Sequence, residues 1–313
     1  MKWLLILLVC VTAANADVTR KQTVSSQFMG ANEGTTIEYY SADRHATEST
    51  LKWTRGMMKT ATGGKTVESG SIVRLDKQLV WSINPKDKTY TEMTFEQFRE
   101  MLKKGNAEVE KAEGERPDTA REEMYTWTVV DKSEAQPKMI GGWNCRNVRI
   151  EATGVSKADS MDKVIMTIDT WNSPDVPGAK EITEFGERYV KALGLDKEAL
   201  TPGLMQASAM YQKQFKELIE AARKAPGEPV QSLMEIKRNQ LKGPDIGKAI
   251  AEGAKNELMG KLPFGRKKEA PKEQKPEYEV KVKFSVTSTL TEASTSATDA
   301  AKYEIPAGYK LKK

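Results

Sequence analysis

The sequence lacks the motifs that mark common enzyme and cofactor sites. It contains no glycine-rich phosphate loop, no His-Glu-x-x-His, no Gly-x-Ser-x-Gly and no Asp-rich calcium loop. A Ser-His-Asp arrangement would have to use His45, the one histidine of the chain, which we expect in a polar surface turn beside Asp43 and Arg44. These absences predict a protein that is not an enzyme and that holds no cofactor.

Long hydrophobic runs are also missing. The apolar run from Trp3 to Val11 is far shorter than the roughly 20 residues that a membrane-spanning helix needs. Lys2 precedes this run and Ala14-Asn15-Ala16 follows it, which is the order of a secretory signal peptide. We therefore expect residues 1–16 to be a signal peptide cleaved after Ala16. The mature chain, residues 17–313, is then exported to the periplasm or the extracellular space without a transmembrane segment.

Cysteine is scarce, and cleavage makes it scarcer. Only Cys10 and Cys145 are present, and removal of the signal peptide would leave Cys145 alone, so an internal disulfide is excluded. One histidine and one cysteine cannot build the usual zinc sites. We expect Cys145 to be a buried small hydrophobe rather than a reactive thiol or an interchain disulfide partner. Lipidation at Cys10 is the alternative, because Leu-Leu-Val-Cys resembles a bacterial lipobox, and it would leave an anchored protein.

No single sign of charge dominates. The 49 basic and 44 acidic residues give a net charge of +5, and loss of Lys2 lowers it by one. A nucleic-acid-binding protein would gather Lys and Arg with aromatic residues on one element, and this chain does not. The charge pattern therefore predicts no nucleic-acid partner.

What the sequence has in abundance is alternation of apolar and polar residues. A period of two is typical of β-strands that are covered on one face. The clearest run is Glu279 to Leu290, which indicates an antiparallel sheet with one buried side. We predict strands over residues 35–41, 51–61, 66–75, 78–84, 88–93, 123–131, 144–152, 163–171, 228–238 and 279–290.

Helical patterns interrupt these strands in three places. Thr94-Phe95-Glu96-Gln97 forms a capping box ahead of a helix that stops at Gly105. Residues 180–193 carry an amphipathic stripe, and residues 201–222 begin with Thr201 as N-cap and Pro202 at the first helical position. The last two helices make up a helical insert, residues 178–224.

A second insert, residues 242–276, differs in composition. Its glycines weaken a helix, and its end is charged and punctuated by proline. We interpret it as a flexible basic loop between two strands. The alternative is a flap, residues 258–268, that touches a lipid surface.

Four stretches resemble an exported bacterial family of unknown function. They are SIVRLDKQLVWSINPKDKTYTEMT (71–94), GGWNCRNVRI (141–150) with the later Asp169-Thr170-Trp171, GEPVQSLMEIK (227–237) and YEIPAGYK (303–310). That family is grouped by fold with the outer-membrane lipoprotein carrier (LolA-like) proteins. The resemblance implies an α+β fold: a strongly curved antiparallel β-sheet, an incomplete barrel, with helices covering its concave face. We expect residues 17–313 to form one such domain.

The resemblance also implies a function, because the concave face of the carrier relatives is apolar and accepts acyl chains. We expect a non-enzymatic envelope protein that binds a lipid, a lipoprotein acyl chain or another hydrophobic ligand in this face. The alternative is a structural or protein-interaction module of the envelope with a filled core, whose partner is another envelope protein. Alternation and the helical stripe select seven inward-facing candidates for the ligand site: Trp53, Trp81, Trp127, Met166, Tyr211, Phe215 and Phe284.

Overall fold

The structure is a computed structural model that describes most of residues 17–313. The described residues are 17–28, 30–101, 103–104, 124–194, 218, 227–241 and 278–312. The expected signal peptide and the insert 242–276 lie outside them. So does the expected helix 201–222, apart from Leu218.

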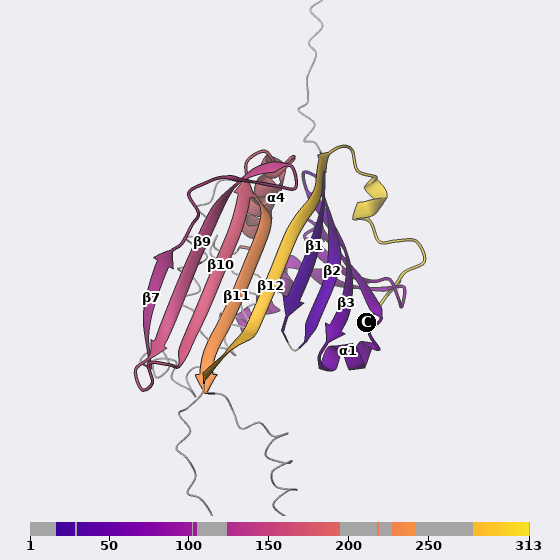
Figure 1. Cartoon of the computed structure of the whole chain (residues 1–313). Helices are drawn as coiled ribbons and strands as arrows, with labels where there is room; N and C mark the ends of the chain where they lie inside the picture. The colour runs from indigo at the N-terminus through magenta and orange to yellow at the C-terminus, as the bar shows by residue number, and fades with distance from the viewer. Residues whose placement is uncertain are drawn as a thin grey trace, which may run out of the picture.

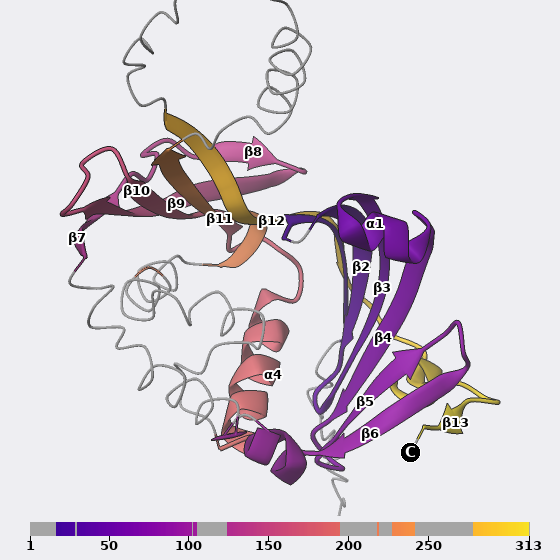
Figure 2. The same cartoon turned by 90° about the horizontal axis from the view of Figure 1, so that it is seen from below.

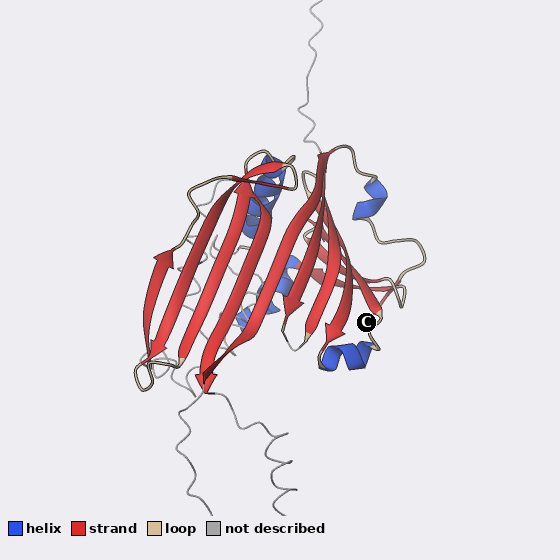
Figure 3. Cartoon of the chain, in the orientation of Figure 1, coloured by secondary structure: helices blue, strands red, loops and turns tan. Residues whose placement is uncertain are grey.

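The described residues form one large open sheet of thirteen strands (Figures 1 and 3). Its strand order is β13-β6-β5-β4-β3-β2-β1-β12-β11-β10-β9-β7, with β8 paired to β9 off this path. Neighbouring strands are antiparallel, except that β13 runs parallel to β6. The strands are β1 Val18–Gln27, β2 Ala31–Tyr40, β3 Arg44–Arg55, β4 Thr66–Arg74, β5 Leu79–Asn84, β6 Thr89–Thr94, β7 Tyr125–Asp131, β8 Lys138–Ile140, β9 Trp143–Ser156, β10 Lys163–Ser173, β11 Glu228–Leu241, β12 Tyr278–Thr295 and β13 Lys310–Leu311.

The sheet turns between β12 and β1, which divides it into two wings (Figure 2). We call β1 to β6 the first wing and β7 with β9 to β12 the second wing. The helix α4, Ala179–Ala192, lies on the inner side of the turn, and we call that side of both wings the inner face. The C-terminal segment with the short 3-10 helix Ala300–Tyr303 lies on the opposite, outer face of the first wing.

The inner face of the first wing is packed against two helices. Residues 95–101 are helical and start at the predicted capping box: the Thr94 amide donates to Gln97 Oε1 (2.8 Å), and the Gln97 amide donates to Thr94 Oγ1 (3.2 Å). Phe95 from this helix and Phe185 from α4 are buried between the helices and the sheet. The buried members of this cluster are Val18, Tyr40, Val73, Phe95, Ile182, Phe185 and Leu193.

Period-two alternation located most strands, and two of its predictions were wrong. The strand predicted over residues 51–61 is correct only to Arg55: β3 runs from Arg44 to Arg55, and the helix α1, Met57–Thr62, follows Gly56, whose φ of 86° turns the chain. His45 is accordingly not in a surface turn. It lies in β3, with its side chain 16% exposed.

The strand β1 was not predicted at all. Its sequence VTRKQTVSSQ has few large apolar residues, yet β2 and β12 pair with it along its whole length. Pairing on both edges satisfies its backbone amides and carbonyls, so a polar strand is stable at the centre of the sheet.

Candidate functional site

Three of the seven predicted ligand-site residues come together on the inner face of the second wing. Met166 on β10 is 1% exposed and belongs to the core there, and Trp127 on β7 and Phe284 on β12 pack against it while partly buried. The strand register aligns side chains of neighbouring strands on one face of the wing, because Val286 pairs with Met234 and Met234 pairs with Ile168. Residues far apart in sequence therefore build one continuous apolar face.

We call this face the inner apolar surface. It is a cluster of apolar and aromatic side chains against which the fully buried Leu218 packs. At its edge, Arg238 lies opposite Val164 and pairs with Asp162. Four of its residues, Trp127, Val148, Met234 and Phe284, are only partly buried. Its strand residues are Tyr125, Trp127, Val148, Ile150, Ala152, Val164, Met166, Ile168, Met234, Ile236 and Phe284.

Trp127 lies flat on the sheet because its neighbour on β9 has no side chain. The register pairs Trp127 with Gly154, and a Cβ built on Gly154 would be 2.8 Å from Cζ2 of the indole. Trp127 also contacts the Tyr125 ring, with centroids 6.1 Å apart. The indole thus forms part of the floor of the inner apolar surface.

The other predicted residues are not part of this set. Trp81 is buried on the outer face of the first wing, where it packs with Ile72 and Tyr303 and its indole donates to Glu92 Oε2 (2.8 Å). Trp81 was wrongly placed with the inward-facing residues, because alternation cannot tell which face of a doubly covered strand is inner. Trp53, near the end of β3, is half-buried and belongs to none of the core clusters. Tyr211 and Phe215 lie outside the described residues.

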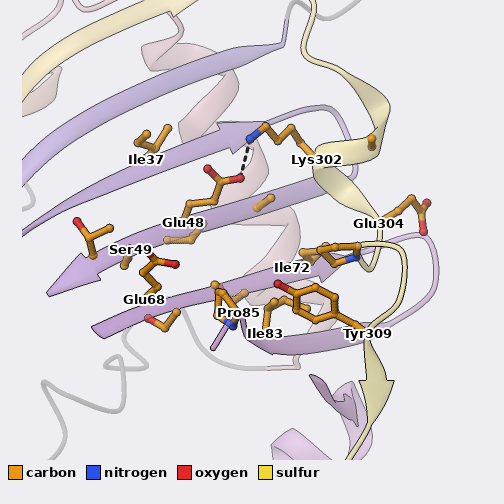
Figure 4. Close-up of a pocket in the computed structure, with 18 of the residues that line it drawn as sticks. Ile37, Glu48, Ser49, Glu68, Ile72, Ile83, Pro85, Lys302, Glu304 and Tyr309 are labelled. Carbon is orange, nitrogen blue, oxygen red and sulfur yellow. Dashed lines mark hydrogen bonds and ion pairs between the residues drawn. The ribbon is translucent and has the colours of Figure 1, made fainter. Parts of the chain in front are cut away.

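A pocket of about 520 Å³ opens on the outer face of the first wing, between the sheet and the C-terminal segment (Figure 4). We call it the outer pocket. One row of its floor crosses four strands, from Ile37 through Glu48 and Gly70 to Ile83. The C-terminal segment closes one side with Lys302, Pro306 and Tyr309. This segment includes part of the 303–310 stretch noted above.

Most charged groups in the outer pocket are paired. Lys302 Nζ bonds Glu48 Oε1 at 2.7 Å, which raises the pKa of Lys302. Glu304 pairs with the buried Arg74 and lies 3.6 Å from Lys77 Nζ. Among the described residues, Glu68 is a lining carboxylate with no ion pair or hydrogen bond of its side chain.

A third feature is a buried polar group where the two wings meet, which we call the junction cluster. Arg20 on β1 is 7% exposed and donates from Nη1 to Glu228 Oε2 on β11 (3.1 Å), across the intervening strand β12. Arg20 Nε lies 3.9 Å from Glu38 Oε2, too far for a hydrogen bond. One arginine therefore faces two carboxylates.

His45 and Tyr40 complete the junction cluster. Their rings stack with centroids 4.3 Å apart, beside Phe185 of α4. The Tyr40 hydroxyl donates to Glu38 Oε1 (3.1 Å), and His45 Nε2 lies 3.7 Å from the same oxygen. The period-two pattern gave no signal for this cluster, because polar residues at such positions are expected to face solvent.

The two carboxylates of the junction cluster have pKa values shifted in opposite directions. Burial raises the pKa of Glu228, and the nearby Arg20 only partly offsets it. For Glu38, burial also acts upward, but the nearby His45 and the charge of Arg20 lower its pKa overall. Burial, together with the Glu38 charge, raises the pKa of Tyr40. Arg20 is thus shared between a carboxylate that stays ionised and one that resists ionisation.

Cys145 is buried, as predicted. It packs with Trp171, Val230 and Leu290, and burial raises the pKa of its thiol. A thiol in this state is a poor nucleophile. Within the described ranges, no group of three or more His, Cys, Asp or Glu residues is placed to hold a metal ion.

None of the helices that the structure describes is long and apolar enough to cross a lipid bilayer. No family model matches the sequence, and no curated protein matches it. A solved structure of a DUF1329 family protein from Desulfovibrio piger matches 93% of this chain and 90% of that chain, with 8% sequence identity and a TM-score of 0.20.

Proposed function

We propose that this protein is an exported, non-enzymatic binding protein that holds an acyl chain or a similar apolar ligand against the inner apolar surface. The observation that carries the proposal is the composition of that surface. Five strands place apolar and aromatic side chains on one face, and four of these side chains keep part of their area uncovered by the rest of the protein.

The chemistry of the surface favours a long, flexible, apolar ligand. Each methylene group moved from water onto an apolar surface contributes about 0.8 kcal/mol, so an acyl chain gains affinity with length and needs no directional contacts. The polar groups at its edge, the Tyr125 hydroxyl and Arg238, are already bonded to Asp162 and are poorly placed to orient a compact polar ligand. Length and apolar area, rather than hydrogen bonds, would then decide which ligands bind.

Helices would provide the lid of such a site. Leu218 is fully buried against the inner apolar surface, and α4 packs on the inner face of the first wing. In the carrier-type (LolA-like) fold that the sequence resembles, helices cover the concave face, and we infer the same arrangement here. Ligand entry would require the cover over the second wing, to which Leu218 belongs, to move away from the sheet.

The expected signal peptide places this activity outside the cytoplasm. Cleavage after Ala16 would give a free carrier, whereas lipidation at Cys10 would give a tethered protein with the same binding face. A mass measurement of the mature N-terminus distinguishes the two.

Native mass spectrometry of the protein purified from its own cell envelope, combined with lipid extraction, tests the proposal. We expect a bound lipid or fatty acid that is lost on organic extraction. A protein that is free of ligand and that also fails to bind a fluorescent fatty acid would instead be the filled-core interaction module.

A further inference from the structure

The outer pocket lies on the opposite face of the sheet from the inner apolar surface, and its chemistry is different. Its floor consists of rows of residues that the strand register aligns. Ala46 and Ile72 lie beside the row Ile37, Glu48, Gly70 and Ile83, and Thr35, Thr50 and Glu68 form the third row. The pocket thus has an apolar end and an acidic, hydroxyl-rich end.

Gly70 gives the pocket much of its depth. It sits in the central row between Glu48 and Ile83, and its φ is outside the left-handed region, so its backbone does not require glycine. A Cβ at this position would lie 3.1 Å from Thr47 O and 3.4 Å from Ile83 Cβ. The missing side chain leaves open the space that a larger residue would occupy.

The charge that remains in the pocket is negative. Lys302, the basic residue that lines it, is neutralised by Glu48 at 2.7 Å, and Glu304 is paired with Arg74. Glu68 has no cationic partner among the described residues and is exposed to the pocket mouth. A cation that enters the pocket would therefore find an unpaired carboxylate.

We propose that the outer pocket binds a small organic amine, whose ammonium group pairs with Glu68 and whose hydrocarbon part packs on Ile83, Pro85 and Tyr309. The volume of about 520 Å³ falls in the usual range of small-ligand pockets. The acidic end repels a carboxylate ligand of the same shape, and the apolar end favours an alkyl amine over ammonium ion itself. This site is independent of the acyl-chain site on the inner face.

A series of three six-carbon probes tests the charge preference. Hexylamine, hexanol and hexanoate share one chain and differ in the charge of the head group at pH 7. In titrations followed by amide chemical shifts, we expect hexylamine to bind most tightly and to shift the amides around Gly70 and Glu68. Equal binding of hexanol or hexanoate, or no binding by any probe, would overturn the proposal.

The substitution Glu68→Gln removes the negative charge of the side chain and keeps its size and shape. Because an ion pair at an exposed carboxylate contributes little, we expect hexylamine to bind about two- to five-fold more weakly to this variant and hexanol to bind unchanged. Glu33→Gln is the matched control, an exposed glutamate on β2 outside the pocket. A Glu68→Gln variant that binds hexylamine as tightly as the Glu33→Gln variant contradicts the assignment of the ammonium site.

Gly70→Val tests the location. The added side chain should fill the floor of the pocket and abolish hexylamine binding, while a circular dichroism spectrum reports that the sheet is intact. Retained binding to the folded variant would place the amine elsewhere. If this variant does not fold, the Glu68→Gln comparison alone decides.

Discussion

The two wings of one continuous sheet are covered in different ways. The first wing is packed on both faces: α4 and the helix at 95–101 bury its inner face, and the C-terminal segment buries Trp81 and Ile72 on its outer face. On the second wing, the helical residue described against the inner apolar surface is Leu218. Partly buried apolar side chains border the clusters of both wings, such as Trp127 and Phe284 on the second and Phe98 on the first. The described cover on the inner face of the second wing is therefore the smaller of the two, and this is the face on which we propose that the ligand binds.

The largest expected effect compares one phenylalanine from each wing. Phe95 is 1% exposed beneath the first wing, so Phe95→Ala should lower the free energy of unfolding by about 3–5 kcal/mol. Phe284 on the second wing is only partly buried, and Phe284→Ala should cost about 1–2 kcal/mol. Urea denaturation of both variants measures the difference. Equal losses would mean that the second wing is packed as fully as the first.

The second prediction concerns Arg20, which joins the wings. Arg20→Gln leaves Glu38 and Glu228 buried without their cation and should lower the free energy of unfolding at pH 7 by about 3–5 kcal/mol. Without Arg20, the pKa of each carboxyl in the folded protein should rise: that of Glu38 loses the lowering effect of the Arg20 charge, and that of Glu228, already raised, rises further. Protonation then relieves the unpaired charges, so the loss relative to the wild type should shrink as the pH falls from 7 toward 4.5.

Lys21→Gln is the control for Arg20→Gln. Lys21 is the next residue on β1, and its ion pair with Glu292 (2.9 Å) is exposed, so its loss should cost less than about 1 kcal/mol. Urea denaturation between pH 4.5 and pH 7 compares the two variants. A loss for Arg20→Gln that is as small as that of the control would show that the junction cluster does not hold the wings together.

The third prediction concerns Gly154, the residue on which the Trp127 indole of the inner apolar surface lies. In Gly154→Ala the new methyl group would meet the Trp127 indole, so the ring must move off the sheet, at a cost of about 1–3 kcal/mol. The fluorescence emission of Trp127 should shift to longer wavelength as the indole becomes more exposed. Gly186→Ala on α4, where an added Cβ meets no atom within 4 Å, should leave the emission unchanged. An unshifted Gly154→Ala spectrum would mean that the indole does not lie on Gly154.

The smallest expected effect tests the cap of the helix that covers the first wing. Thr94→Ala removes the hydroxyl that accepts from the Gln97 amide and should lower the free energy of unfolding by about 1 kcal/mol. Thr94→Ser keeps the hydroxyl and should retain most of the stability in the same denaturation experiment. If both variants lose the same amount, the capping bond does not stabilise this helix.

Local patterns predicted local structure well. The capping box at Thr94, the helix α4 and strands such as β10 follow from spacing alone, because the residues that define them are neighbours in the chain. The strand β1 was missed because its stability comes from pairing with β2 and β12, not from its own composition. The partners of β1 on β12 lie more than 250 residues away, so the local sequence pattern of β1 does not indicate them.

The candidate sites were predictable only in part. Alternation predicted that Trp127, Met166 and Phe284 each point to the inner face of their own strand. The strand register then brings the three side chains together in one cluster. It misplaced Trp81, because both faces of the first wing carry apolar residues and only the tertiary packing decides which element covers which face. The outer pocket could not be predicted either, because it forms where the C-terminal segment folds back over β3, β4 and β5.

One matched pair of variants tests the central claim, apolar ligand binding on the inner face of the second wing. Val129 and Val130 are neighbours on β7 with similar exposure, 41% and 43%. Val129 is opposite Ala152 of the inner apolar surface, whereas Val130 is opposite Glu151 on the outer face. With a fluorescent fatty acid as the probe, Val129→Asn should weaken binding several-fold, and Val130→Asn should leave it unchanged. Equal affinities for the two variants, or a larger loss for Val130→Asn, would contradict a ligand site on this face.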